Sequence, residues 1–516
     1  MYDIILKNGL VLDGRGNKAK KANVAIFSDS IALVTDKEIA RARTVIDCTG
    51  KYVAPGFIDG HTHTDFLLLN DEKASPRVGQ GITTDISGNC GIGVFPYTNP
   101  ILKTMVQDVL GEWREWKWKD YKTMKNYYMT KKIGVNVLFL VSHTALRVAS
   151  LGEDCRREAT DEEIERMCSI LRSELQSGAG GFSTGLYYSP CVYSSIDELY
   201  RILKVVKEEN KIFTVHHRSE GNGCTESLKE VLEVAFKSGV KTEISHLKAI
   251  GRKNQVEVDK MLSLIEEYRE RGLDVKFDQY PYTFGSTSLF SLLPPRILAL
   301  TRLEQRMALS LDSEREEIRN EILNAQTWDS IYPLVGPDDI VALYLTTNPE
   351  YNGKSLSEIA QIRGDKDPLE TLFDILRDET GLAVMTDRTE SQESLERIMV
   401  HPLMCFGTDS LYSSPLPHPR SYHSTVEFLS KYVRDKKLLT LEEAVRRMTS
   451  ETASRFSLLD RGVLDEGYRA DVVVFNLDEL KANDDKTNNG ISTVIVNGKI
   501  ALQDGVIFST GAGRVL

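Results

Sequence analysis

Eight short apolar segments, each long enough for one buried strand, alternate with helix-like segments through the middle of the 516-residue chain. The predicted strands are Val53–Asp59, Ile82–Ser87, Val135–Val141, Gly181–Thr184, Ile212–His216, Thr242–His246, Val275–Asp278 and Met404–Thr408. Strands that alternate with helices are typical of βα units around a parallel sheet, and eight such strands close a barrel. We therefore predict an α/β fold built on a (β/α)8 TIM-like barrel.

Two capping boxes support the predicted helices. Thr160-Asp161-Glu162-Glu163 opens one helix, and Thr440-Leu441-Glu442-Glu443 opens another. The link between strands seven and eight is much longer than an ordinary βα connection. It contains the charged helical stretch Arg302–Leu323 and further structure to about Pro402. A link of this length predicts an insertion that forms a lid or subdomain.

Both ends of the chain have a different texture, with short strands and tight turns. Asn8-Gly9, Asp13-Gly14 and Asn497-Gly498 are hairpin signals. We expect the two ends to form one small discontinuous β-sandwich domain. The predicted division is 1–54 and 456–516 for this β-domain and 55–455 for the barrel, with the insertion at about 285–400.

Charge and cysteine usage exclude several classes of protein. The net charge of −11, with no basic cluster to offset it, argues against binding to a nucleic-acid backbone. No apolar run approaches the length of a membrane span, and the first residues lack the pattern of a signal peptide. The 7 cysteines are scattered and show no Cys-x-x-Cys spacing, which indicates reduced thiols and a cytoplasmic protein.

Side chains that commonly bind metals gather at the ends of the predicted strands. His61 and His63 follow the first strand, and because residues alternate between faces they would project to one side. The remaining candidates, at four further strand ends, are Cys90, His216, His246 and Asp409. In a barrel these ends meet at one rim, which is where chemistry takes place.

A donor set of imidazole and thiolate suits zinc better than magnesium or calcium. Each residue alone has a structural explanation, since Cys90 could be a buried inert thiol and any one histidine could be packed. Alternation along the fifth strand makes His216 the better ligand and His217 the structural histidine. His143 is likewise interpreted as a support for the barrel. Six candidates at one rim favour a metal site.

In its motifs the chain resembles, nearly from end to end, the N-acyl-D-amino-acid deacylase (D-aminoacylase) family of the amidohydrolase superfamily. The matching motifs are Gly56-Phe57-Ile58-Asp59-Gly60-His61-Thr62-His63, Gly88-Asn89-Cys90-Gly91, Gly180-Gly181-Phe182-Ser183-Thr184-Gly185-Leu186 with Tyr188 and Pro190, His216-x-Arg218, Ser245-His246-Leu247-Lys248, Asp278-Gln279-Tyr280-Pro281-Tyr282, Gly407-Thr408-Asp409, His418-Pro419-Arg420 and the tail Gly467-Tyr468-Arg469-Ala470-Asp471.

The resemblance implies a zinc-dependent hydrolase of N-acyl-D-amino acids. Relatives that open cyclic amides bridge their metals with a carbamylated lysine on strand four, which this chain lacks; in the deacylases a cysteine serves, here Cys90. By the family pattern, one tightly bound zinc sits on Cys90, His216 and His246. His61, His63 and Asp409 form a second pocket, which could be empty, weakly occupied by metal or catalytically polar, and Asp409 is the expected general base.

The resemblance also implies residues that hold the substrate. Arg420 is the candidate for the α-carboxylate, because a planar guanidinium binds a carboxylate in a bidentate manner. Lys248, Tyr282 and Tyr188 resemble further substrate-binding residues. One departure is His423, which stands where the family usually has glycine.

Other readings of the sequence stay open. The chain could be another amidohydrolase, such as a cyclic-amide hydrolase or a dipeptidase, or a metal-free barrel retained as a scaffold. Arg296 could read an acidic substrate side chain, although a surface arginine is the more common case. The expected partner is a small N-acyl amino acid, with no nucleic acid and no membrane. Side-chain preference, metal number and oligomeric state are not fixed by the sequence.

Overall fold

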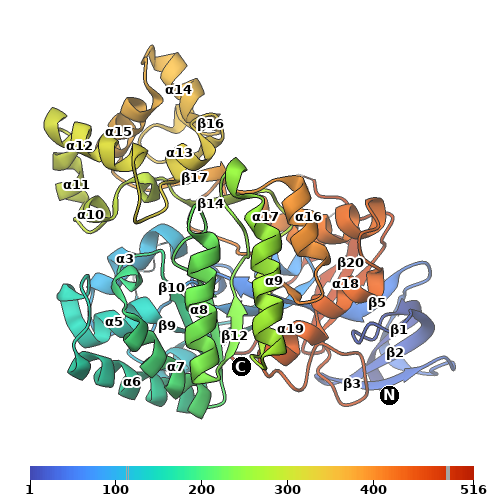
Figure 1. Ribbon diagram of the computed structural model, residues 1–516. Coiled ribbons are helices and arrows are strands. Elements are labelled where there is room, and N and C mark those ends of the chain that lie inside the picture. Colours follow the sequence, from blue (N-terminus) through green and yellow to red (C-terminus); the bar gives the residue numbers. More distant parts are fainter. Residues whose placement is uncertain (112, 114, 484–488) are drawn as a thin grey trace.

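The computed structural model describes residues 1–111, 113, 115–483 and 489–516. It has three regions: a barrel, a β-sheet region built from both chain ends, and a lobe that stands on the barrel (Figure 1). Within the described residues, no helix is long and apolar enough to cross a membrane.

Parallel strands form the predicted barrel. They are β6 (Phe57–Thr62), β7 (Ile82–Ser87), β8 (Asn136–Phe139), β9 (Val141–Ser142), β10 (Gly181–Gly185), β11 (Ile212–His216), β12 (Lys241–Ile244), β13 (Val275–Gln279) and β18 (Met404–Phe406). They pair in the orders β6-β7-β8 and β9-β10-β11-β12-β13-β18. The short strands β8 and β9 are two parts of the predicted third strand. The ring closes where the amide of Asp409 donates to the carbonyl of His61 at 2.7 Å.

The first predicted strand, Val53–Asp59, is wrong as one unit. Its first half, β5 (Tyr52–Pro55), belongs to the sheet of the chain ends, and its second half is β6 of the barrel. The change of sheet occurs at Gly56, whose amide donates to the carbonyl of Asp471 at 2.8 Å. A Cβ there would lie 2.3 Å from Thr83 Oγ1, so only glycine fits this crossing.

Helices surround the barrel. They are α1 (Leu67–Asn70), α2 (Ser75–Val78), α3 (Ile101–Leu110), α4 (Tyr121–Met129), α5 (His143–Leu151), α6 (Asp161–Gln176), α7 (Ile196–Glu208), α8 (Cys224–Ser238), α9 (Glu257–Glu270), α16 (Gln392–Val400), α17 (Arg420–Glu427), α18 (Leu441–Arg447) and α19 (Ser450–Arg455). The capping box at Thr160 is confirmed. At Thr440 only half of the predicted box forms: Thr440 accepts the amide of Glu443, but the Glu443 carboxylate pairs with Arg446 and Arg447.

Buried charges tie α2 to the barrel beneath the site. Arg77 is fully buried and forms ion pairs with Asp59 of β6 and Asp85 of β7. Asp59 also accepts the amide of Thr408 at 2.9 Å, beyond the end of β18. A buried cation with two carboxylates is well compensated, and here it holds three strands in a fixed relation.

Strands from both chain ends form one sheet of 9 strands, in blue and red in Figure 1. Besides β5 these are β1 (Tyr2–Val11), β2 (Lys20–Phe27), β3 (Ser30–Thr35), β4 (Ala42–Asp47), β19 (Val472–Phe475), β20 (Ile491–Val496), β21 (Lys499–Gln503) and β22 (Val506–Ile507). The Asn497-Gly498 hairpin is confirmed by the pairing of β20 with β21. The Asn8-Gly9 hairpin is wrong: β1 continues through it with an irregularity between Leu6 and Gly9.

The insertion follows β13 and forms the lobe at the top of Figure 1. Its sheet has the order β14-β17-β15-β16. Its elements are β14 (Phe284–Ser288), β15 (Ile340–Leu345), β16 (Lys354–Ser355), β17 (Ala383–Arg388), α10 (Pro295–Leu298), α11 (Arg302–Ala308), α12 (Asp312–Leu323), α13 (Ile331–Val335), α14 (Leu356–Arg363) and α15 (Pro368–Asp378). The single helical stretch expected over Arg302–Leu323 is two helices. Because the insertion leaves from the carboxyl end of β13, it stands over the rim that carries the predicted ligands.

Candidate active site and metal centre

All six predicted ligands meet at the carboxyl rim of the barrel. They form two groups of potential donor atoms, each within 4.8 Å, and Cys90 belongs to both. The first group is Cys90, His216 and His246, and the second is His61, His63, Cys90 and Asp409.

The first group has the spacing of ligands around one tetrahedral ion. His216 Nδ1 lies 3.0 Å from His246 Nε2, and Cys90 Sγ lies 3.4 Å from the same nitrogen. Bonds of about 2.0–2.3 Å from zinc to nitrogen and sulfur place neighbouring ligand atoms about 3.3–3.8 Å apart. The sulfur–nitrogen distance lies in this range and the nitrogen–nitrogen distance is slightly below it, so a small separation of the two rings would let these residues hold a zinc ion.

The second group surrounds a neighbouring point. His61 Nε2 lies 3.3 Å from Cys90 Sγ and 3.5 Å from Asp409 Oδ1. His63 Nε2 lies 3.3 Å from the same carboxylate oxygen. With two imidazoles, a carboxylate and the shared thiolate, this group could hold a second ion beside the first.

Three of the six candidate ligands have left-handed backbones. The φ angles are 53° at Cys90, 33° at His246 and 49° at Asp409. Such conformations cost about 1–3 kcal/mol each outside glycine and cluster at functional sites. Close packing fixes the turn at Cys90, because a Cβ at Gly185 would lie 2.2 Å from its carbonyl oxygen. Gly185, at the end of β10, thus positions a ligand that follows β7, a strand with which β10 does not pair.

Two further carboxylates orient the histidines. Asp278 lies 3.1 Å from His61 Nδ1 and accepts the amide of His246 at 2.9 Å. Glu220 lies 3.1 Å from His246 Nδ1 and accepts Lys248 Nζ at 2.7 Å. Carboxylates behind ligating histidines fix ring orientation and increase ligand basicity. Sequence reasoning assigned neither residue to the site; Glu220 lies beyond the end of β11 at His216, where strand alternation no longer applies.

The charges of the site favour a bound cation. Burial raises the pKa of the Cys90 thiol, but His61 and His246 outweigh it and hold that pKa well below its usual range. Burial also raises the pKa of Asp409, yet Arg420 and His63 hold it well below the usual value. Thiolate and carboxylate are the forms that bind metals.

A cavity opens beside the centre, between the barrel rim and the insertion. It is lined by Tyr187, Tyr188, His216, Glu220, His246, Lys248, Ile250, Tyr280, Gly285, Ser286, Thr287, Asp329, Ile331, Asp387, Thr389, Asp409 and Arg420. Three of the four predicted substrate-binding residues are among them: Tyr188, Lys248 and Arg420.

Tyr282, the fourth, is not among the lining residues of the described chain, and Tyr280 is. The ring of Tyr282 packs against Phe284 and His418, at centroid distances of 5.7 and 5.3 Å. Alternation along β13 directs Asp278 and Tyr280 inwards, but the strand ends at Gln279 and the chain turns away. Within the described chain, the buried hydroxyl of Tyr280 has no hydrogen-bond partner.

Arg420 is 1% exposed and forms an ion pair with Asp409, with Nη1 2.8 Å from Oδ2. Its Nη2 donates to the carbonyl of Ser286 at 3.1 Å, and its guanidinium lies 4.9 Å from the ring centroid of Tyr280. Its Nε has no partner among the described residues. Arg420 thus links the candidate base to the cavity.

The remaining histidines lie outside the metal groups found in the described chain. His217 is buried on the other face of β11, 3.2 Å from Ser227 Oγ, and burial lowers its pKa to about 3. His143 is buried between Thr184 and Glu198. His423, which departs from the family pattern, is not among the cavity residues found in the described ranges.

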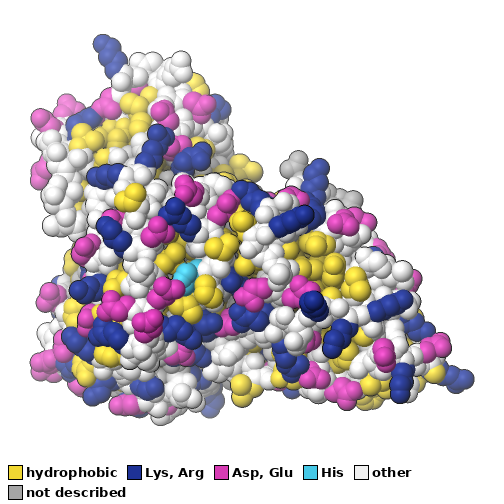
Figure 2. Space-filling model, turned by 45° about the vertical axis from the view of Figure 1, so that its right-hand side comes forward, with side chains coloured by type: hydrophobic (Ala, Val, Ile, Leu, Met, Phe, Trp, Pro, Cys, Tyr) yellow, Lys and Arg dark blue, Asp and Glu magenta, His cyan; other side chains and the backbone are white. Residues whose placement is uncertain are grey.

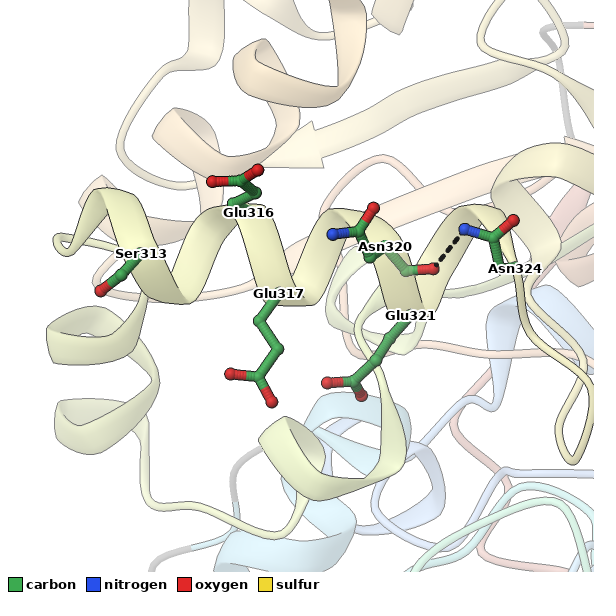
Figure 3. Close-up of a pocket in the computed structure, with 6 residues that line it drawn as sticks. All are labelled: Ser313, Glu316, Glu317, Asn320, Glu321 and Asn324. Atoms are coloured by element: carbon green, nitrogen blue, oxygen red, sulfur yellow. Dashed lines mark hydrogen bonds between the residues drawn. The ribbon is translucent and has the colours of Figure 1, made fainter.

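Arg296 is a surface arginine with a structural role and does not line the cavity found in the described chain. It forms ion pairs with Glu314, Glu317 and Glu321 of α12, in the insertion. Figure 3 shows Glu317 and Glu321 projecting from one side of this helix, along a shallow surface hollow. That hollow contains none of the candidate ligands, and its Glu317 and Glu321 belong to a solvated helix face that binds Arg296.

A barrel that carries imidazole, thiolate and carboxylate donors beside a polar cavity defines a metal-dependent hydrolase. The sequence pattern of the amidohydrolase family matches residues 44–259 and 346–502. D-aminoacylase from Alcaligenes xylosoxydans xylosoxydans is 32% identical over 527 residues, which cover 100% of this chain and 97% of that protein.

Solved structures agree. N-acyl-D-glutamate deacylase from Bordetella bronchiseptica, complexed with zinc and a phosphonate mimic of the tetrahedral intermediate, matches with a TM-score of 0.84 and 30% identity over 100% of this chain and 99% of that one. A D-aminoacylase studied for its binuclear metal centre matches with a TM-score of 0.83 and 30% identity over 100% of both chains. The chain belongs to the amidohydrolase family, and within it to the D-aminoacylase and N-acyl-D-amino-acid deacylase group.

Proposed function

We propose that this protein hydrolyses N-acyl-D-amino acids to a D-amino acid and a carboxylate, with zinc as its metal. The observation that carries the proposal is Cys90, which is shared by two groups of potential ligands beside a cavity with two buried cations. Strand β10, Gly181–Gly185, offers no lysine that could be carbamylated. The preference for the D-configuration follows from the relatives.

The proposal assigns one tight metal position to Cys90, His216 and His246, and a second position to His61, His63 and Asp409. Imidazole and thiolate are the donors that zinc prefers. The ring nitrogens that face these two positions are His216 Nδ1, beside His246 Nε2, and His63 Nε2, beside Asp409. Zinc bound here would polarise the scissile carbonyl and lower the pKa of the attacking water to about 7.

Asp409 is placed to move the proton that hydrolysis requires. Its Oδ1 faces His61 and His63, and its Oδ2 faces Arg420 at the cavity. Because Arg420 and His63 keep the carboxylate ionised, it begins the reaction as a proton acceptor. It takes the proton of the attacking water and returns it to the departing nitrogen.

Arg420, Lys248 and Tyr280 form a binding site for the α-carboxylate. The Nε of Arg420 and the hydroxyl of Tyr280 are buried donors without a partner in the described residues. Lys248 is 5% exposed and donates to Glu220 and to the carbonyl of His246, so its charge is held in one position. A carboxylate beside a guanidinium and an ammonium is well compensated.

Hydrolysis of N-acetyl-D- and N-acetyl-L-amino acids by the zinc-loaded protein, scored as free amine, tests the function. We expect turnover of D-substrates and much slower turnover of L-substrates. Turnover of L-substrates alone, or of cyclic amides alone, would overturn the proposal. A wild-type protein without bound metal after zinc exposure would remove its basis.

We further propose that the enzyme works in the cytoplasm on small molecules. Support comes from the seven free cysteines, Cys48, Cys90, Cys155, Cys168, Cys191, Cys224 and Cys405. On the face drawn in Figure 2, Lys and Arg are interspersed with Asp and Glu, which is not the pattern of a nucleic-acid surface.

A further inference from the structure

The insertion places an acidic side chain in the cavity, Asp387 of β17. It is 3% exposed and lines the cavity. Its Oδ2 has no hydrogen-bond partner among the described residues. Burial raises the pKa of this carboxyl to about 6, against smaller effects of Lys248 and Arg420. A buried carboxylate with an unmade hydrogen bond is costly, and such groups often mark a ligand site.

The strand pairing of the insertion sets where Asp387 lies. In the antiparallel pair β14 and β17, Asp387 is opposite Gly285. A Cβ built on Gly285 would lie 3.5 Å from Asp387 Oδ1 and 3.5 Å from Tyr280 Oη. The absent side chain therefore leaves space between the acid and the tyrosine assigned to the α-carboxylate. Asp387 therefore lies within reach of a substrate anchored at Tyr280.

The other acids of the cavity are already compensated. Glu220 accepts Lys248, and Asp409 is paired with Arg420. Asp329 accepts the hydroxyl of Ser219 and two backbone amides, those of residues 220 and 221. Among the four acids that line the cavity in the described chain, Asp387 is the one with a buried carboxylate oxygen that has no hydrogen-bond partner.

The cavity offers no spare cation for an acidic side chain. Of the lining residues, Lys248 and Arg420 are the cations, and both have carboxylate partners. Arg296 is engaged with α12. Ile250 and Ile331 supply apolar surface in the same cavity, which suits the methylene stem of a long basic side chain.

We infer that Asp387 binds the cationic end of the substrate side chain, so that the preferred substrates are N-acyl derivatives of D-lysine, D-ornithine or D-arginine. This inference rests on the proposed function and specifies its substrate class. The ammonium or guanidinium would donate the hydrogen bond that Asp387 Oδ2 lacks and would place a positive charge beside its carboxylate. An acidic side chain would be repelled by the same carboxylate.

The test compares Nα-acetyl-D-lysine with Nα-acetyl-D-norleucine, which has a similar chain without the ammonium, and with N-acetyl-D-glutamate. A charge-assisted hydrogen bond predicts kcat/KM about 10- to 100-fold higher for lysine than for norleucine. D387N should reduce this ratio at least about tenfold, because the ion pair is lost. E316Q is the matched control, since it removes an exposed acid from α12 of the same lobe (Figure 3) and should keep the ratio.

A second measurement is independent of turnover. Binding of D-lysine and of D-norleucine is measured by thermal shift on wild type and D387N, with zinc content confirming that each variant is folded. Wild type should bind D-lysine more tightly, and D387N should lose that preference. If norleucine is hydrolysed as well as lysine, or D387N keeps the preference, the inference is overturned while the proposed function stands. If no N-acyl-D-amino acid is hydrolysed, the proposed function itself fails.

Discussion

Two buried clusters of the barrel contain the same kinds of side chain, but only one is built for chemistry. The Cys90 centre joins a thiol, histidines and a carboxylate beside the cavity. A second cluster joins Cys191, His143 and Glu198, with His143 Nδ1 2.7 Å from Thr184 Oγ1 and Nε2 2.9 Å from Glu198. Both ring nitrogens of that histidine have protein partners. It is a closed structural network.

Electrostatics alone does not separate the two clusters. The pKa of the Cys191 thiol is lowered by His143, although burial raises it, as the pKa of Cys90 is lowered by its own histidines. What differs is the geometry. The Cys90 donors surround shared points and border a cavity, whereas the Cys191 cluster satisfies its own hydrogen bonds. A lowered thiol pKa indicates function only together with access and open coordination.

Removal of each thiol gives the largest contrast. We expect C90S to lose tight zinc binding and to reduce kcat/KM by at least about 10⁴-fold, since enzymes of this kind accelerate reactions by about 10⁶-fold or more. C191S should retain zinc and activity. Metal analysis and amine release measure both. Equal loss in the two variants, with both folded by circular dichroism, would remove the distinction between the clusters.

Replacing the candidate base tests the open side of the Cys90 centre. D409N keeps the size of the side chain but cannot accept the proton, so kcat should fall about 10²- to 10⁴-fold. The zinc on Cys90, His216 and His246 should stay bound. Activity within tenfold of wild type would show that another group takes the proton.

Local signals in the sequence predicted the barrel and its ligands. Val, Ile and Phe runs ended in polar residues at successive strand ends, and alternation separated His216 from His217. The failures arise where tertiary pairing decides. Asn8-Gly9 has hairpin chemistry, but pairing of β1 with β2 on both sides carries the strand through it. At Gly56 a continuous apolar run is divided between two sheets.

The substrate side of the site was less predictable. Tyr282 was assigned from the family resemblance, whereas Tyr280 is the tyrosine of this motif that lines the cavity in the described chain. Asp387 is about a hundred residues along the chain from Gly285, the residue opposite it in β14. Its position therefore depends on the pairing of β14 with β17. Its neighbours along the chain carry no sign of a site. Sequence patterns therefore predicted the metal side and not the specificity side.

Replacing Glu220, which supports the Cys90 centre, and Glu198, which belongs to the Cys191 cluster, should have different effects. E220Q weakens the support of His246 and should reduce zinc affinity about 10- to 100-fold, measured by competition with a chelator. E198Q, in the closed cluster, should leave zinc affinity unchanged and lower thermal stability instead, because it leaves Arg147 with a weaker partner. Loss of zinc affinity in E198Q would mean that the clusters are coupled.

The smallest expected effect is the pH dependence of the stability that His143 contributes in the Cys191 cluster. Burial opposes the charged form of His143, but Cys191 and Glu198 raise its pKa to about 9 from 6.5. A raised pKa contributes stability that is complete below the unfolded value and is lost as pH rises through the folded value. The stability advantage of wild type over H143Q should therefore be largest below pH 6.5 and shrink by a few degrees in melting temperature, about 2–5 °C, once pH exceeds 9. Zinc-loaded proteins melted at one scan rate at pH 6 and pH 9.5 provide the measurement. A difference that does not change with pH would show that His143 is neutral in the folded protein and that hydrogen bonds alone hold the cluster.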